Sequence, residues 1–221
     1  MRTASGAAAR TAPHARREPV IYAEQTRADL VAAARKLFVD NGFADTSVEA
    51  ITAAAQVSKG TFYHHFPDKK AMFAELYTEL LQRVGALADA ASEAIRATPG
   101  EPALAAVSNL THAFLQRTID DPLHRELMAQ APSVLVEQYR HINDTVAQPP
   151  IERLLTVLAE RGDVEPDVPV ATVARLLLAV LCEGNQIIAA AADREDALAR
   201  TFHTITLLMS GLAADGVSAH G

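Results

Sequence analysis

Residues 46–66, TSVEAITAAAQVSKGTFYHHF, decide how the N-terminal part of this 221-residue chain folds. The stretch predicts two short helices joined by a tight turn. Thr46 and Glu49 fit a capping box, in which a hydroxyl starts the helix and a carboxylate follows three residues later. Apolar residues then recur at helical spacing, at Val48, Ile51 and Ala55. The first helix is therefore expected to bury one face.

The second half of this stretch combines a turn with a basic helix start. Residues 56–57 make the turn, and Ser58 can cap the helix that follows. Lys59, Gly60 and Thr61 fall in the first turn of that helix, where exposed backbone amides can meet a phosphate or a base edge. This is the arrangement of a helix-turn-helix, whose second helix enters the major groove of DNA.

The flanking segments extend the motif into a larger unit. Residues 26–41 carry apolar side chains on one helical face, Gly42 suits the position after a helix end, and Asp68 suits a helix start. Around a motif at about residues 47–66, the run from residue 24 to 84, with SVEAITAAAQVSKGTFYHHFPDKKAMF at its centre, resembles the TetR family of bacterial transcriptional regulators. The resemblance implies an all-α protein. Its N-terminal domain would be a three-helix helix-turn-helix DNA-binding domain, and its C-terminal domain a helical ligand-binding and dimerisation domain.

The resemblance also implies which residues contact DNA. The first motif helix would present hydroxyls to backbone phosphate, and the second would read the major groove. A lysine at the next helix start would contact phosphate. The implied residues are Thr46, Ser47, Ser58, Lys59, Gly60, Thr61, Tyr63, His64 and Lys69. His64 stands where many relatives have Tyr, and Lys59 by itself could be an ordinary solvated lysine. Phe62 and Phe66 are expected in the core.

The net charge of −7 is unusual for a DNA-binding protein, but it is unevenly distributed. Residues 1–22 carry a net charge of +3, residues 23–84 carry −1, and residues 85–221 carry −9. Every lysine precedes residue 71. Because affinity for DNA depends on the local patch that faces it, an acidic C-terminal part is compatible with DNA binding.

Composition narrows the class of protein further. Hydrophobic residues make up 49% of the chain and aromatic residues 5%, with no Trp, which favours helices over sheets. Cys182 is the single cysteine, so an internal disulfide and a multi-cysteine zinc site are excluded. No uncharged apolar run reaches the roughly 18 residues that span a bilayer. The N-terminus lacks the apolar segment of a secretory signal. We therefore expect a cytoplasmic protein with no membrane partner.

The chain divides into three predicted parts. Residues 1–22 read as a disordered basic arm, with a minor-groove arm as the alternative. Residues 23–84 would form the DNA-binding domain and residues 85–215 the effector-binding and dimerisation domain. Beyond the motif we predict helices at residues 68–97, 102–119, 121–128, 132–143, 151–161, 168–192 and 193–213, with an interruption at Gln148-Pro149-Pro150 and an end at Gly162.

The last two predicted helices, at about residues 168–192 and 193–213, bear on assembly. The first is apolar around most of its circumference, so it requires burial on two sides. In TetR-like proteins these helices pack against their counterparts in a second subunit, which implies a homodimer. The alternative is that they form the core of a monomeric bundle.

The C-terminal domain is expected to bind a small-molecule effector, as the resemblance implies. Polar or soft side chains lie within its otherwise apolar helices, a mixture that suits a ligand pocket. Each of them could instead be a satisfied core residue or a surface residue. The candidates are His112, Gln116, Met128, Tyr139, Cys182, Asn185 and Gln186.

The sequence offers no motif for catalysis, a metal or a cofactor. His64 and His65 are adjacent, so on a helix they point about 100° apart and cannot easily share an ion. Zinc-binding, phosphate-loop and nucleophile-elbow patterns are missing. The favoured function is a ligand-responsive repressor that binds double-stranded DNA at a palindromic operator as a dimer. An architectural DNA-binding protein and a small-molecule-binding module with little DNA specificity remain the alternatives.

Overall fold

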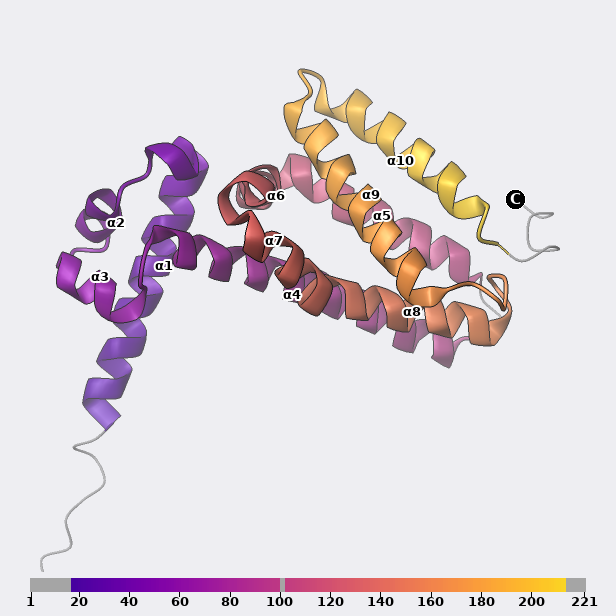
Figure 1. The fold of residues 1–221 in the computed structure, drawn as a ribbon, viewed down its shortest axis with the longest axis horizontal. Coiled ribbons are helices and arrows are strands. Elements are labelled where there is room, and N and C mark those ends of the chain that lie inside the picture. The colour runs from indigo at the N-terminus through magenta and orange to yellow at the C-terminus, as the bar shows by residue number, and fades with distance from the viewer. Residues whose placement is uncertain (1–16, 100–101, 214–221) are drawn as a thin grey trace, which may run out of the picture.

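The computed structural model describes residues 17–99 and 102–213. Within these ranges the chain is helical, and its one β-type pairing is an isolated bridge between Val164 and Ala213. The predicted all-α fold is confirmed. Helices α1–α3 gather at one end and the others form a larger domain (Figure 1). The elements are α1 (Arg17–Asp45), α2 (Val48–Ala54), α3 (Lys59–His65), α4 (Lys69–Ala97), α5 (Ala103–Asp120), α6 (Pro122–Leu135), α7 (Glu137–Ile142), the π-helical turn η2 (Asn143–Ala147), α8 (Gln148–Arg161), α9 (Val170–Ala190) and α10 (Arg194–Ser210).

Helix α1 begins earlier than the sequence indicates. Residues 17–22, assigned above to a disordered arm, are helical, and residues 1–16 lie outside the described part of the chain. Once packing has formed the helix over residues 26–41, adding turns at its N-terminus needs no new nucleation. Gly42 interrupts α1 with a φ of 75° and a ψ of 175°, a non-helical backbone conformation that glycine adopts more readily than other residues.

The helix-turn-helix forms with the predicted turn and with one corrected cap. Ser47, rather than Thr46, caps α2, because its Oγ accepts the N–H of Ala50 at 3.0 Å. Gln56 turns the chain with a φ of 56°. The Oγ of Ser58 then accepts the N–H of Thr61 at 3.1 Å and caps α3, as expected.

Side chains from all four N-terminal helices share one core. Leu30 and Phe38 of α1, Ile51 of α2 and Phe62 of α3 are buried together with Phe73 of α4. The rings of Phe38 and Phe73 meet edge to face, with centroids 5.6 Å apart. The predicted core position of Phe62 is confirmed, and this burial fixes which face of α3 points outward.

Helix α4 runs from the small unit into the larger domain (Figure 1). Asp68 caps it as predicted, with its Oδ1 accepting the N–H of Ala71 at 2.6 Å. Two ion pairs, Arg27–Glu75 and Arg35–Glu79, fasten α1 to the first half of α4. The domain boundary expected at residue 84 therefore falls inside one continuous helix.

Two helix boundaries predicted in the middle of the chain are wrong. Helix α6 continues beyond Met128 to Leu135 and contains Pro132, which was expected to start a new helix. The proline costs one backbone hydrogen bond. Packing of α6 against α1, α4 and α9 outweighs that cost. The break comes instead at Val136, whose φ is 46°. The expected interruption near Pro149 and Pro150 coincides with the end of η2 and the first turn of α8.

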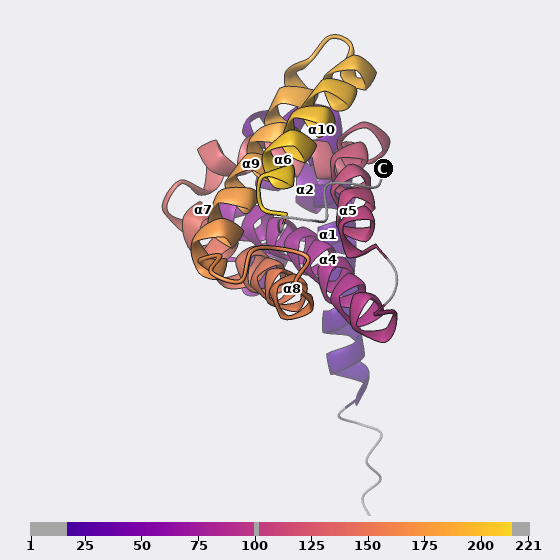
Figure 2. The same cartoon turned by 90° about the vertical axis from the view of Figure 1, so that its right-hand side faces the viewer.

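Helices α9 and α10 run alongside each other (Figures 1 and 2). Helix α9 is long and apolar enough to cross a membrane by length and composition alone, although it contains Arg175 and Glu183. It packs against α5, α6, α8 and α10, and a core helix of a soluble protein has the same composition. Large apolar side chains nevertheless remain exposed on this pair, namely Leu176, Ile187, Leu207 and Leu208.

A close approach of α4 and α8 gives a stability prediction. A Cβ added at Gly85 would lie 2.9 Å from Cγ of Pro150, whose ring cannot rotate away. Gly85→Ala should therefore lower the free energy of unfolding by about 1–2 kcal/mol, since overpacking outweighs the better helix propensity of Ala. Urea unfolding followed by circular dichroism measures the change. Gly60→Ala, whose added Cβ would lie at an ordinary van der Waals distance of 3.6 Å from Ser58 Oγ, is the control, and equal midpoints for both variants would contradict the packing argument.

Candidate functional site

Helix α3 presents a polar face to solvent at the surface of the N-terminal unit. Lys59, Gly60, Tyr63 and His64 are exposed, and the Tyr63 side chain stands 55% exposed although it is large and aromatic. The ring of Tyr63 meets the edge of the buried Phe62, with centroids 5.4 Å apart. The core thus holds one face of α3 and leaves the other face available to a partner.

Lys59 is paired with an acidic residue of the preceding helix. Its Nζ donates to Glu49 across the turn between α2 and α3, and both side chains are more than half exposed. The hydrogen bond from Lys59 lowers the pKa of Glu49, and the same bond raises the pKa of Lys59. Exposed ion pairs are weak, so a phosphate can replace Glu49 as the partner of Lys59.

Thr46 does not lie on the DNA-facing surface, contrary to the prediction. Its side chain is 1% exposed, and its Oγ1 donates to the carbonyls of Gly42 at 2.7 Å and Leu37 at 3.1 Å. The residue ties the end of α1 to the start of the motif. The neighbouring Ser47 remains exposed.

Lys69 is also used differently from the prediction. Its Nζ donates to the carbonyls of Phe43 and Thr46, and lies 4.2 Å from the centroid of the Phe43 ring. Burial lowers the pKa of Lys69. The ammonium therefore stabilises the chain between α1 and α2 and helps to hold the motif together.

Metal binding finds no support in the described part of the chain, where no cluster of three or more His, Cys, Asp or Glu side chains occurs. His64 and His65 lie edge to face with ring centroids 5.2 Å apart. Burial lowers the pKa of His65, with the neighbouring His64 and Arg27 adding to the effect.

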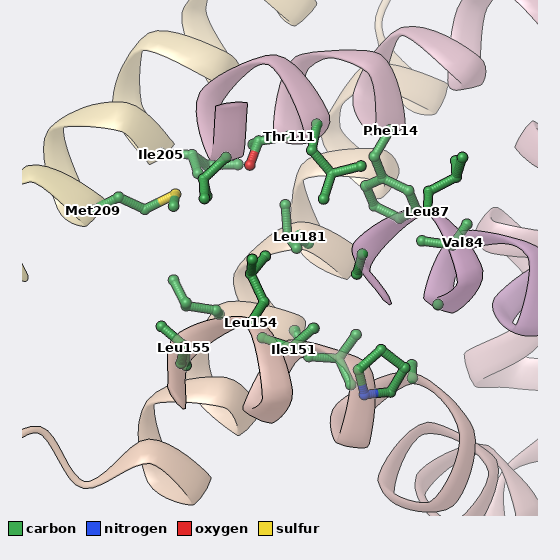
Figure 3. A pocket seen from close by; sticks show the side chains of 18 of the residues that line it. Val84, Leu87, Thr111, Phe114, Ile151, Leu154, Leu155, Leu181, Ile205 and Met209 are labelled. Atoms are coloured by element: carbon green, nitrogen blue, oxygen red, sulfur yellow. The ribbon is translucent and has the colours of Figure 1, made fainter. Parts of the chain in front are cut away.

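The larger domain encloses an apolar cavity of about 110 Å³ between α4, α5, α8, α9 and α10. Figure 3 shows Val84 and Leu87 of α4, Phe114 of α5 and Met209 of α10 facing the same space. An engineered apolar cavity of ~150 Å³ binds benzene, so this one is large enough for part of a small organic molecule. Arg117 is the one charged residue in its lining.

Most of the predicted ligand residues lie elsewhere. Of the seven, Cys182 lines the cavity, and burial raises the pKa of its thiol. Tyr139 and Gln186 line a separate open groove between α6, α7, η2 and α9, which Cys182 also borders.

The other four candidates make contacts that account for them without a ligand. His112 is exposed against the ring of Phe202, and Gln116 donates to Asp120 at 3.2 Å. Met128 is buried in the core, and Asn185 belongs to a buried hydrogen-bond network. None of these four residues lines the apolar cavity.

The buried network around Asn185 was missed by the sequence reading. Its Oδ1 accepts from Thr118 and lies 3.0 Å from Nε2 of His124, while its Nδ2 donates to the carbonyl of Leu181 at 2.8 Å. Burial lowers the pKa of His124, and its Nδ1 has no hydrogen-bond partner in the described structure. The sequence held no signal for this, since Thr118, His124 and Asn185 belong to three different helices.

Comparisons with known proteins agree with this arrangement. Residues 30–76 match the family model described as bacterial regulatory proteins, tetR family, and residues 104–212 match the one described as tetracyclin repressor-like, C-terminal domain. The regulator UidR of Escherichia coli strain K12 is 31% identical over 159 residues, which cover 71% of this chain and 78% of UidR.

Solved structures give the same result. A TetR-family regulator from Pectobacterium atrosepticum is 29% identical, with a TM-score of 0.70, covering 87% of this chain and 96% of that one. A gamma-butyrolactone receptor is 25% identical, with a TM-score of 0.58, covering 90% and 93%.

The hydrogen bonds of Lys69 predict that its loss destabilises the fold more than loss of the neighbouring Lys70. Lys69→Ala removes the donor to two backbone carbonyls and should lower the free energy of unfolding by about 1–2 kcal/mol. Lys70→Ala is the matched control and should change it by less than about 0.5 kcal/mol, as at most surface positions. Thermal unfolding followed by circular dichroism compares the two. An unchanged melting temperature for Lys69→Ala would show that its bonds to the two carbonyls do not stabilise the fold.

Proposed function

Because this chain belongs to the TetR family of bacterial regulatory proteins, we propose that it is a ligand-responsive repressor that binds a palindromic operator as a homodimer. DNA-binding transcriptional regulation is the activity of the family. The observation that carries the finer proposal is the combination of an exposed helix α3 with an apolar cavity, connected through α4. We assign it no catalytic role and place it in the cytoplasm, at its operator on the nucleoid.

The proposed DNA contacts lie on the exposed side of the motif. Lys59 and Thr61 would reach base edges or phosphate, Gly60 would allow the backbone to approach the groove, and Tyr63 would reach phosphate. Their support is the exposure of Lys59, Gly60 and Tyr63 and the partial exposure of Thr61, together with a core that holds Phe62 inward. The proposed set is Ser47, Ser58, Lys59, Gly60, Thr61, Tyr63 and His64.

The proposed dimer forms through α9 and α10. Leu176 and Ile187 on α9 and Leu207 and Leu208 on α10 are exposed in the isolated chain, although a soluble monomer rarely exposes a cluster of large apolar residues. A two-fold interface buries the same patch on both subunits. It would set the two α3 helices at half-sites about 34–36 Å apart, or a multiple of that distance.

The proposed control works through two arrangements of the dimer. A ligand that binds better to the arrangement with the wrong α3 separation releases the operator. Helix α4 supports such coupling, because it is bonded to α1 through Glu75 and Glu79 and lines the cavity through Val84 and Leu87. The N–H of Phe43 donates to Gln130 of α6 at 2.8 Å, which gives a second contact between the two domains.

Selection from a random duplex library tests the DNA-binding proposal. The full-length chain at near-physiological salt should enrich an inverted repeat. Lys59→Ala and Tyr63→Phe should then bind that repeat about tenfold more weakly, because each loses a contact to DNA. If Lys59 contacts phosphate, the slope of log affinity against log salt concentration should also be less steep for Lys59→Ala, by about one unit. Lys36→Ala, an exposed lysine paired with Asp40 on α1, is the control.

Two results would contradict the DNA contacts. If no inverted repeat is enriched, the proposal of a palindromic operator is wrong. If Lys59→Ala and Tyr63→Phe both fold and both bind with wild-type affinity at matched salt, these two residues do not contact DNA as proposed.

The dimer gives a second prediction. Leu208→Glu places a charge on the exposed apolar patch and should give a folded monomer by sedimentation velocity, with operator affinity at least about tenfold weaker because one half-site is lost. Ala90→Glu, an exposed alanine of α4, should stay dimeric. A Leu208→Glu variant that sediments as a dimer would move the interface away from α10.

A further inference from the structure

The apolar cavity lies beside a second space, a groove with charged side chains in its lining. The groove has a volume of about 290 Å³ and lies between α4, α5 and the start of α6. Val84, Leu87 and Arg117 line both spaces, so the two adjoin. An apolar body bound in the cavity would therefore lie next to the charged side chains of the groove.

The groove carries an excess of positive charge. Arg83 of α4 and Arg117 of α5 both line it, against one carboxylate, that of Asp121. Arg117 Nη1 lies 3.9 Å from Oδ2 of Asp121, while the described residues give Arg83 no ion pair. Both arginine side chains come from exposed positions, so an anion placed between them would keep part of its hydration.

A buried histidine adds a polar atom that the fold leaves unpaired. His124, 1% exposed, also lines this groove. The Nδ2 of Asn185 donates to the Leu181 carbonyl, so Oδ1 is the acceptor that faces Nε2 of His124. The proton of a neutral imidazole is therefore on Nε2. Nδ1 is left with an unpaired lone pair, which can accept a hydrogen bond but cannot bind a carboxylate, so any anion in the groove depends on the two arginines.

We propose that the effector is an amphipathic anion, with an apolar body in the cavity and a carboxylate held by Arg117 and Arg83. This inference rests on the ligand-responsive function proposed above and specifies its ligand class. An apolar lining cannot hold a charge, so the carboxylate remains at the arginines while the body fills the space against Phe114 and Leu154. Two guanidinium groups can each donate charge-assisted hydrogen bonds to one carboxylate.

The other groove of the domain suits an anion less well. Arg140 and Arg175 line it, but Asp144 and Glu183 line it too, so its charges balance. It therefore serves as an internal comparison. An anion that chose this groove would depend on Arg140 instead of Arg117.

Calorimetric titration of the full-length protein with straight-chain carboxylates, from butanoate to dodecanoate, tests the proposal. Each carboxylate is paired with the neutral amide of the same length. We expect carboxylate affinity to rise with chain length until the cavity is filled, and to exceed that of the amide by about ten- to a hundredfold. Arg117→Gln should abolish most of this preference, Arg83→Gln should reduce it, and Arg140→Gln should leave it unchanged.

Three results would each overturn the proposal. The first is equal affinity for carboxylate and amide, and the second is no binding by any carboxylate of the series. The third is a preference for carboxylate that is lost in Arg140→Gln and kept in Arg117→Gln. Circular dichroism melts show whether Arg117→Gln is folded, and Arg83→Gln gives an independent reading on another helix. Adding the same compounds to the protein–operator complex distinguishes failure of the ligand proposal from failure of the repressor proposal. If an amide releases the operator and its carboxylate does not, the protein is a ligand-responsive repressor, but its effector is not an anion.

Discussion

Helix α4 is the constraint on which both halves of this protein depend. It spans 29 residues, or roughly 43 Å at 1.5 Å per residue. Phe73 at its start belongs to the core that holds α3, and Val84 and Leu87 further along line the cavity. A continuous helix cannot bend at low cost without a proline or a break. Anything that displaces its cavity end therefore moves the element to which α1 is ion-paired.

Several polar side chains that were expected to contact DNA or a ligand form hydrogen bonds within the protein instead. Thr46 and Lys69, both expected at DNA, bond to carbonyls around the end of α1. Asn185, expected at a ligand, satisfies His124 and Thr118. Unpaired buried polar groups cost free energy, so such bonds form wherever geometry allows. This leaves the cavity lined almost entirely by apolar side chains, and it makes the unpaired Nδ1 of His124 unusual.

The local parts of the fold could be predicted because their causes are local. The caps at Ser58 and Asp68, the turn at Gln56 and the end at Gly162 each depend on residues within one helical turn. Boundaries that depend on distant packing could not be predicted. Pro132 stays inside α6 because α1, α4, α5 and α9 all pack against that helix. The start of α1 at Arg17 likewise extends a helix that was formed by packing elsewhere.

The sequence by itself determined an all-α chain with a helix-turn-helix and an exposed α3, because caps, turns and apolar periodicity are written in neighbouring residues. Only the tertiary structure decided where the cavity lies and which residues reach it. Val84, Phe114 and Leu154 are ordinary apolar residues in the sequence, and they line one cavity only because the fold brings α4, α5 and α8 together around it. The meeting of Arg83, Arg117 and His124 has the same origin, since no periodicity relates side chains on separate helices.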